Sequence, residues 1–211
     1  MKKTSDYAVA VIGLGSMGFG AAASCINAGL TTYGVDINPQ ALERLRQAGA
    51  AQADTRIDAF ADKLDAVVLL VVNAAQVNGI LFGEPQVAAK LKPGTVVMVS
   101  STISAQDAKN IEQRLAEHQL IMLDAPVSGG AVKAAAGDMT VMASGSDLAF
   151  EKLKPVLDAV AGKVYRIGEE IGLGATVKII HQLLAGVHIA AGAEAMALAA
   201  RADIPLDIMY D

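Results

Sequence analysis

The sequence contains no tryptophan and a single cysteine, and aromatic residues make up only 4% of it. Because 53% of the residues are nevertheless hydrophobic, the core has to be built from Ala, Val, Ile, Leu and Met. That composition suits helices packed closely on a parallel sheet. The one cysteine, Cys25, excludes an intrachain disulfide and fits a protein of the reducing cytoplasm.

Clusters of basic residues are also missing. The 211 residues carry a formal net charge of −5 and contain no run of Lys or Arg. Nucleic acid and anionic membrane surfaces are therefore unfavourable partners, and we expect a small-molecule ligand instead. The opening residues, MKKTSDYAVAVIGLG, contain only a short apolar run without a small-residue cleavage site. They predict a first strand rather than a signal peptide.

One long apolar segment lies near the C-terminal end. The run from Leu183 to Leu198 is rich in Ala and contains Glu194 and two glycines, which predicts a buried helix rather than a membrane span. The helical pattern extends over residues 175–202, and 28 residues at 1.5 Å each span about 42 Å. Because that length exceeds what a small domain needs, we expect a connector into a second, helical domain that is largely absent from these residues.

Before this segment, β-type runs alternate with amphipathic helical patterns. The alternation predicts an α/β fold with a doubly wound Rossmann-type sheet. We expect residues 1–168 to form a dinucleotide-binding domain, residues 169–203 a long interdomain helix, and residues 204–211 the start of a truncated helical C-terminal domain. The expected strands cover residues 7–13, 31–36, 66–72, 93–101, 120–127, 139–144 and 163–168. The expected helices of the first domain cover residues 17–30, 38–49, 105–118 and 146–162.

A glycine motif follows the first expected strand. Gly13, Gly15 and Gly18 form the pattern G-x-G-x-x-G, which serves a tight turn, close approach to a pyrophosphate and helix–sheet packing. A purely structural turn is the alternative, but Asp36 lies 18 residues beyond Gly18 at the end of the second strand. A carboxylate there accepts hydrogen bonds from ribose hydroxyls and repels a 2′-phosphate, and residues 37–39 offer no cation to hold one. NAD is therefore favoured over NADP.

Two loops of small residues follow later strands. Residues 100–102, SST, close a strand at the edge where ligands of open α/β sheets bind, although hydroxyl residues also end strands and cap helices for structural reasons. Residues 128–130, SGG, present backbone N–H groups that suit a carboxylate, with a flexible loop as the alternative.

The apolar helix contains Lys178, His181 and His188. Burial lowers the pKa of a lysine, so Lys178 could act as base in oxidation of an alcohol and as acid in the reverse reaction; otherwise it extends from the helix to solvent. The two histidines are seven residues apart, about 10.5 Å along the axis, which is too far to share a metal ion, and we expect no metal. His181, one turn from Lys178, is the better candidate for a site residue, and His188 for a structural position.

Taken together, these motifs resemble the β-hydroxyacid dehydrogenase family, which includes 3-hydroxyisobutyrate dehydrogenase. The resemblance covers essentially the whole chain and rests on GLGSMG with Asp36, on SSTIS, on DAPVSGG followed by GDMTVMASG, and on the G-x-x-x-K of GATVK. It implies a hydroxyacid dehydrogenase with Lys178 as catalytic acid/base. The residues implied or expected to bind the cofactor are Gly13, Leu14, Gly15, Ser16, Met17, Gly18, Asp36, Ile37, Asn38, Val72, Asn73, Gln76 and Thr102. Those for the substrate are Thr102, Ser128, Gly129, Gly130, His181 and Gln182.

One departure from the family pattern bears on the substrate. The family usually carries Asn three and four residues after the lysine, where this sequence has His181 and Gln182. The exchange resembles the branch that oxidises a four-carbon sugar acid, L-threonate, at C2 to 2-dehydro-L-erythronate. Tartronate semialdehyde reductase and 3-hydroxyisobutyrate dehydrogenase activities remain alternatives, whereas Lys178 weighs against an imine reductase. A non-catalytic NAD-binding regulatory module is the alternative from another class.

The expected second domain affects what these residues do alone. We expect them to bind NAD but to turn over substrate poorly, because part of the site would come from the helical domain. The apolar face of the long helix would lack its cover, which favours self-association and a homo-oligomer.

Overall fold

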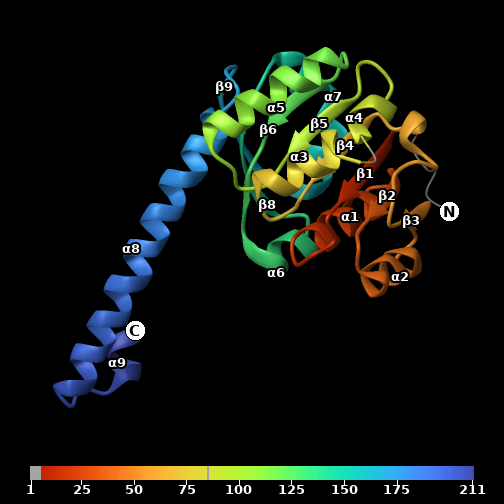
Figure 1. Ribbon diagram of the computed structural model, residues 1–211. Helices are drawn as coiled ribbons and strands as arrows, with labels where there is room; N and C mark the ends of the chain where they lie inside the picture. The colour runs from red at the N-terminus through yellow and green to blue at the C-terminus, as the bar shows by residue number, and fades with distance from the viewer. Residues whose placement is uncertain (1–5, 85) are drawn as a thin grey trace.

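The computed structural model describes residues 6–84 and 86–211. Residues 1–5, which belong to the segment expected not to be a signal peptide, lie outside the described part. Within that part, nine strands form one sheet with helices on both faces (Figure 1). The strands are β1 (Ala8–Ile12), β2 (Thr31–Val35), β3 (Gln52–Asp54), β4 (Ala66–Leu69), β5 (Val96–Val99), β6 (Ile121–Asp124), β7 (Val127–Ser128), β8 (Met139–Ser144) and β9 (Ala161–Gly168). The helices are α1 (Gly18–Asn27), α2 (Pro39–Gln47), the 3₁₀ turn η1 (Ala61–Lys63), α3 (Ala74–Phe82), α4 (Val87–Lys90), α5 (Ala105–Glu117), α6 (Gly130–Ala135), α7 (Asp147–Val160), α8 (Leu173–Arg201) and α9 (Leu206–Tyr210).

The sheet confirms the predicted doubly wound class. Its first six strands are parallel in the order β3-β2-β1-β4-β5-β6, so the order reverses between β1 and β4. Beyond β6 the direction changes, because β8 runs antiparallel to β6 and β7, while β9 runs parallel to β8. The expected strand over residues 120–127 is two strands, β6 and β7, separated at Ala125 and Pro126. Proline has no N–H to donate to a ladder, which explains the break.

The sheet buries apolar residues on both faces. In β1, Val9 and Val11 belong to one core cluster, and Ala8, Ala10 and Ile12 to the other. This division follows from the alternation of side chains along a strand. Helices α1, α2, α6 and α7 contribute to the first cluster, and α3, α4, α5 and the start of α8 to the second. A strand buried on both faces therefore reads as a continuous apolar run, as the sequence does here.

Three predicted helix starts are confirmed by their caps. The side chain of Asn38 accepts a hydrogen bond from the Gln40 N–H (2.9 Å), with Pro39 as the first helical residue of α2. The hydroxyl of Ser104 accepts from the Asp107 N–H at the start of α5 (3.0 Å). Ser146 caps α7 in the same way. Each cap satisfies an N–H group that has no partner within its own helix.

Helix α8 projects from the sheet, and α9 lies at its far end (Figure 1). Its 29 residues span about 44 Å at 1.5 Å per residue. The expected burial of the run from Leu183 to Leu198 is wrong for the described chain, because the buried residues of α8 are Gly174, Ala175, Lys178 and Ala199. Among described residues, only the short α9 returns to the distal part of α8, so its apolar side chains face outward. By length and composition alone, α8 would be able to cross a membrane.

Candidate cofactor and substrate site

The loop between β1 and α1 shows why glycine occupies each position of its motif. At Gly13 the backbone has φ +90°, and an added Cβ would lie 2.6 Å from the Leu70 carbonyl oxygen. At Gly18 an added Cβ would lie 1.7 Å from the Gly13 carbonyl oxygen, so the start of α1 packs directly on the loop. At Gly15, by contrast, a Cβ would meet nothing within 4 Å. The fold therefore requires two of the glycines, and the third leaves open space where a pyrophosphate would sit.

Asp36 ties this loop to the end of β2. Its Oδ2 accepts a hydrogen bond from the Leu14 N–H (2.5 Å), and its Oδ1 accepts one from the Asn38 N–H (2.8 Å). Each carboxylate oxygen can accept more than one hydrogen bond, so both remain able to receive ribose hydroxyls. Asp36 thus holds the loop in place, and it also lies where a carboxylate is expected to bind the ribose of the cofactor.

A cavity of about 540 Å³, here called the Asp36 cavity, lies beside this carboxylate. Its wall includes the predicted cofactor residues Gly13, Gly15, Asp36, Ile37, Val72 and Gln76. It also includes residues that the sequence analysis did not single out: Ile12, Val35, Thr55, Arg56, Ile57, Leu70, Val71, Gly79, Ile80, Glu84 and Val87. Five of these eleven follow β3 or belong to α3, two short elements that the patterns did not predict.

Arg56 is a cation that the sequence argument for NAD over NADP did not include. Residues 37–39 carry no cation, as the sequence indicated, but the fold brings Arg56 to the wall of the same cavity. The Arg56 Nε donates to Asp58 Oδ2 (2.7 Å), and Lys90 pairs with the other oxygen of Asp58. The hydrogen bond from Arg56, together with Lys90, lowers the pKa of Asp58 to about 2. The cation in this wall is therefore already paired, whereas Asp36 and Glu84 add negative charge to the cavity.

A second cavity of about 550 Å³, the Lys178 cavity, is lined in part by Gly15, Ser16 and Met17 of the glycine loop. The two cavities share Gly15, Leu70, Val71 and Val72, so they adjoin where the strand order reverses. The structure brings the loops after β1, β4, β5 and β7 together with α8 at this point. The lining residues are Gly15, Ser16, Met17, Leu70, Val71, Val72, Ser100, Ser101, Thr102, Val127, Ser128, Gly129, Gly130, Lys178 and Gln182.

Lys178 is the charged side chain in this wall. It is only 6% exposed, and it forms no hydrogen bond or ion pair with any residue in the described ranges. Loss of solvent on burial lowers the pKa of its amine. A buried amine without a fixed partner is costly to the fold and is free to exchange a proton with a ligand.

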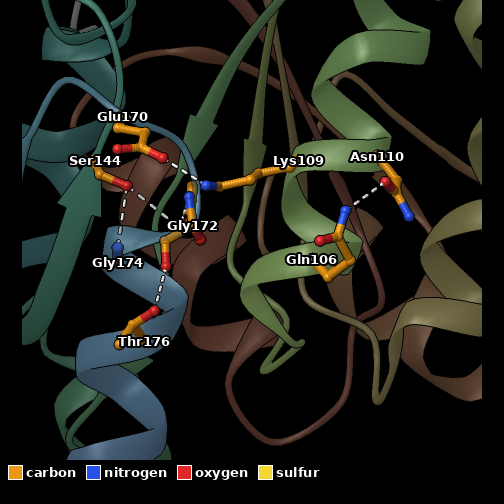
Figure 2. A network of polar contacts seen from close by, with 9 residues as sticks. Gln106, Lys109, Asn110, Ser144, Glu170, Gly172, Gly174 and Thr176 are labelled. Atoms are coloured by element: carbon orange, nitrogen blue, oxygen red, sulfur yellow. Dashed lines mark hydrogen bonds and ion pairs between the residues drawn. The ribbon is translucent and has the colours of Figure 1, made fainter.

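The start of α8, which carries Lys178, is held by side chains of two strands (Figure 2). The Oδ2 of Asp124, at the end of β6, accepts hydrogen bonds from the Gly172 N–H (3.0 Å) and the Ala175 N–H (2.9 Å). The hydroxyl of Ser144, at the end of β8, accepts from the Gly174 N–H (3.0 Å) and donates to the same Asp124 oxygen (3.3 Å). Burial raises the pKa of Asp124, while these hydrogen bonds favour its ionised form.

Five predicted site residues do not line either cavity. They are Leu14, Gly18, Asn38, Asn73 and His181. Leu14 and Gly18 are buried, Asn38 and Asn73 cap α2 and α3, and His181 is exposed on α8. Asn73 still organises the Asp36 cavity indirectly, because it accepts from the Gln76 N–H, and Gln76 in turn accepts from the Val72 N–H.

Ser100 and Ser101 line the Lys178 cavity beside the predicted Thr102. Ser101 accepts a hydrogen bond from the Val71 N–H (3.2 Å), which ties two strand ends together. The hydroxyl of Ser100 is buried and has no hydrogen-bond partner among the described residues. An unsatisfied buried hydroxyl in a cavity wall favours contact with a ligand. The sequence placed the hydroxyls of residues 100–102 at the ligand-binding edge of the sheet, with a purely structural strand end as the alternative.

This arrangement defines a dinucleotide-dependent oxidoreductase, and comparisons with known proteins agree. Residues 8–168 match the NAD-binding domain of 6-phosphogluconate dehydrogenase. Residues 172–211 match the NAD-binding domain of NADP-dependent 3-hydroxyisobutyrate dehydrogenase. The chain belongs to the 3-hydroxyisobutyrate dehydrogenase-like, or β-hydroxyacid dehydrogenase, family of NAD-dependent enzymes.

Individual relatives are similar along the whole chain. An L-threonate dehydrogenase of Pectobacterium atrosepticum is 98% identical over all 211 residues, which cover 69% of its length. An L-threonate dehydrogenase of Escherichia coli strain K12 is 68% identical over the whole chain, which covers 70% of its length. The crystal structure of a 3-hydroxyisobutyrate dehydrogenase from Salmonella typhimurium is 64% identical, with a TM-score of 0.91 over 97% of this chain and 71% of that one.

The space around Gly15 and Gly18 predicts that alanine weakens NAD binding at the first position and lowers stability at the second. Gly15→Ala should leave the thermal transition nearly unchanged, because its Cβ has space, but weaken NAD binding by on the order of tenfold by filling the pyrophosphate position. Gly18→Ala should lower the transition temperature, because its Cβ would overlap the Gly13 carbonyl. Calorimetric titration with NAD and thermal unfolding measure the two effects. Wild-type NAD affinity in Gly15→Ala would contradict the assigned space.

A second prediction concerns cofactor choice. Asp36→Ala should weaken NAD more than NADP, and the NAD/NADP ratio of binding constants should fall by at least about tenfold, because the change removes a ribose acceptor and a charge that repels phosphate. Both affinities should also decline, since the Leu14 and Asn38 N–H groups lose their acceptor. Asp62→Asn, an exposed carboxylate change outside both cavities, serves as control. Equal losses for the two cofactors would refute this role of Asp36.

Proposed function

We propose that the protein oxidises L-threonate to 2-dehydro-L-erythronate with NAD, and that the reaction takes place in the Lys178 cavity. The observation that carries the proposal is a buried lysine without a partner among described residues, in one wall with the Ser128–Gly129–Gly130 loop and Thr102. The substrate is supported by the names of the relatives that are 98% and 68% identical.

The cofactor would extend across both cavities. The ribose hydroxyls of its adenosine half would donate hydrogen bonds to the Asp36 carboxylate, and its pyrophosphate would lie at the start of α1. There the N-cap residue Met17 provides no side-chain cap, which leaves backbone N–H groups for an anion. The nicotinamide would then reach the Lys178 cavity beside Thr102. The open space at Gly15, shared by both cavities, fits this path.

The substrate carboxylate would bind to the loop before α6. Gly129 and Gly130 have φ values of +129° and +70°, and α6 begins at Gly130. Consecutive N–H groups in such a conformation, with the Ser128 hydroxyl, suit a carboxylate. Gln182 lines the same cavity one turn beyond Lys178 and would bind an additional hydroxyl of the sugar acid. His181 is exposed on α8, and its contact with a substrate hydroxyl stays a prediction.

In this assignment Lys178 carries the proton. NAD, when bound, supplies the hydride acceptor for the hydrogen on C2 of the substrate. As the C2–H bond breaks, the neutral Lys178 amine takes the proton of the C2 hydroxyl, and the C–O bond becomes a carbonyl. The resulting ammonium donates a hydrogen bond to that carbonyl oxygen. In the reverse direction the ammonium returns the proton to the oxygen.

We further propose that the protein works as a homo-oligomer in the cytoplasm without nucleic-acid or membrane partners. The exposed apolar residues of α8 support association. We also propose a dinucleotide-binding domain over residues 1–168, a long interdomain helix over residues 169–203 and the start of a helical domain over residues 204–211. The first boundary is supported by the two matched segments, which end at residue 168 and begin at residue 172.

Substrate profiling tests the assignment. The complete protein should oxidise L-threonate with NAD at a kcat/KM at least about tenfold above those for D-erythronate, D-glycerate and 3-hydroxyisobutyrate, because a site that binds extra hydroxyls rejects substrates lacking them. Higher activity with 3-hydroxyisobutyrate would favour the second candidate, which the 64% identical structure supports. NAD binding without turnover of any of these acids would indicate a regulatory module instead.

Substitution of the lysine tests the mechanism. Lys178→Met keeps a similar length and removes the exchangeable proton, so kcat should fall by about 10²–10⁴ while NAD binding is preserved. Lys178→Arg should restore little, because Arg does not lose its proton near neutral pH. Lys154→Met, an exposed change on α7, is the matched control. Near-normal turnover in Lys178→Met would eliminate the proposed role.

The pH dependence follows from the same amine. Desolvation lowers the pKa of Lys178, and the neutral base becomes populated as pH rises through that lowered value. The kcat/KM for oxidation should therefore rise with pH to a plateau, and that for reduction should fall over the same range. Both limbs should be lost from the residual activity of Lys178→Met.

A further inference from the structure

The carboxylate of Asp124 lies outside the wall of the Lys178 cavity, yet it is fully buried beneath the helix that carries the lysine. Asp124 and Ser144 are direct neighbours across the antiparallel pair of β6 and β8. Both side chains are directed at the first turn of α8, where Figure 2 shows the hydrogen bonds that Ser144, Gly172 and Gly174 form. The contact joins two strand ends to one helix start.

Helix α8 has no cap of its own. Its N-cap residue is Gly172, which has φ +100° and no side chain. The first N–H groups of the helix are satisfied by Asp124 and Ser144 from elsewhere in the chain. The positive end of the helix dipole also offsets part of the cost of burying a carboxylate. Only Oδ2 of Asp124 takes part, because Oδ1 has no hydrogen-bond partner among the described residues.

The first turn of α8 also lies directly against the strand backbone. A Cβ added at Gly174 would come within 2.7 Å of the carbonyl oxygens of both Asp124 and Met142. Lys178 follows four residues later, about 6 Å along the axis, on the same side of the helix. A shift of this first turn would therefore move the lysine amine by a similar amount.

We propose that Asp124 is a positioning residue, which fixes the first turn of α8 and thereby holds the Lys178 amine in the catalytic cavity. This inference rests on the proposed proton transfer by Lys178. Asp124 acts through the backbone, since no hydrogen bond or ion pair joins it to Lys178. Ser144 supports the same turn through the Gly174 N–H.

The test compares two replacements of Asp124 in the complete protein. Asp124→Ala removes the acceptor, and kcat for L-threonate should fall by about 10²-fold, the order expected when a reacting group is displaced by 1 Å. The dissociation constant for NAD should change by less than about twofold, because its expected contacts come from other loops. Asp124→Asn keeps an amide oxygen at the Oδ2 position and should retain kcat within about threefold of wild type. Assays are run well below each variant's thermal transition.

Double substitution separates positioning from general stability. In a Lys178→Met background, Asp124→Ala should cause no further loss of kcat, because the group that it positions is gone. Ser144→Ala removes the hydroxyl that accepts from the Gly174 N–H and should lower kcat by about threefold to tenfold. This variant tests the positioning role if Asp124→Ala does not fold. Lys109→Met, which breaks only the exposed Lys109–Glu170 pair near the same turn, should have wild-type kcat.

The possible failures are distinguishable. Wild-type kcat in both Asp124→Ala and Ser144→Ala would overturn the positioning role, as would equal losses from Asp124→Ala with and without Lys178. If Asp124→Ala is unfolded, wild-type kcat in Ser144→Ala alone overturns it. Wild-type turnover in Lys178→Met would instead refute the proposed function itself.

Discussion

The attachment of α8 to the end of the sheet is the constraint on which the candidate site depends. A helix start leaves N–H groups without partners, and a buried carboxylate is expensive unless it is hydrogen-bonded. Asp124 and the first turn of α8 satisfy each other, with Ser144 as the second acceptor. Because Gly174 lacks a side chain, the helix approaches the strand backbone closely enough for these bonds to form. The position of Lys178 one turn later is a consequence of this contact.

The glycine loop between β1 and α1 is held by similar contacts at the Asp36 end of the site. Gly13 and Gly18 allow backbone to pack on backbone, and Asp36 fastens the loop to β2 through the Leu14 N–H. Both contacts satisfy polar backbone groups near strand ends at the carboxyl edge of the sheet. Since the two cavities adjoin at Gly15, a dinucleotide bound along this edge would place one end near Asp36 and the other near Lys178. Both ends of that path are thus attached to strand ends, at β2 through Asp36 and at β6 and β8 through the first turn of α8.

Much of this arrangement could be predicted, because its signals are local in sequence. The glycine motif lies directly between a strand and a helix. The starts of α2 and α5 follow from residues next to them, and Lys178 is a single charge in an apolar helix. The role of Asp124 could not be found this way, since its partners lie 48 and 51 residues further on. Arg56 escaped notice because β3 has only three residues, too few for a periodic pattern. Hydrophobic alternation also carries no strand direction, which is why the reversal at β8 was not anticipated.

The exposure of α8 in the structure differs from the burial that its apolar composition predicts. Its apolar sequence predicts burial, and its first turn is buried on the sheet, but beyond Lys178 the described chain covers little of it. An apolar helix that is buried at one end and exposed along its remaining length presents the kind of surface that packs against other protein. The relatives are longer than this chain, which spans 69–70% of those compared. The buried first turn fixes where the lysine amine lies, whereas the exposed part, including Gln182 and His181, leaves the far wall of the cavity to whatever packs on the helix. Proton transfer and substrate selection would thus depend on different parts of the same helix.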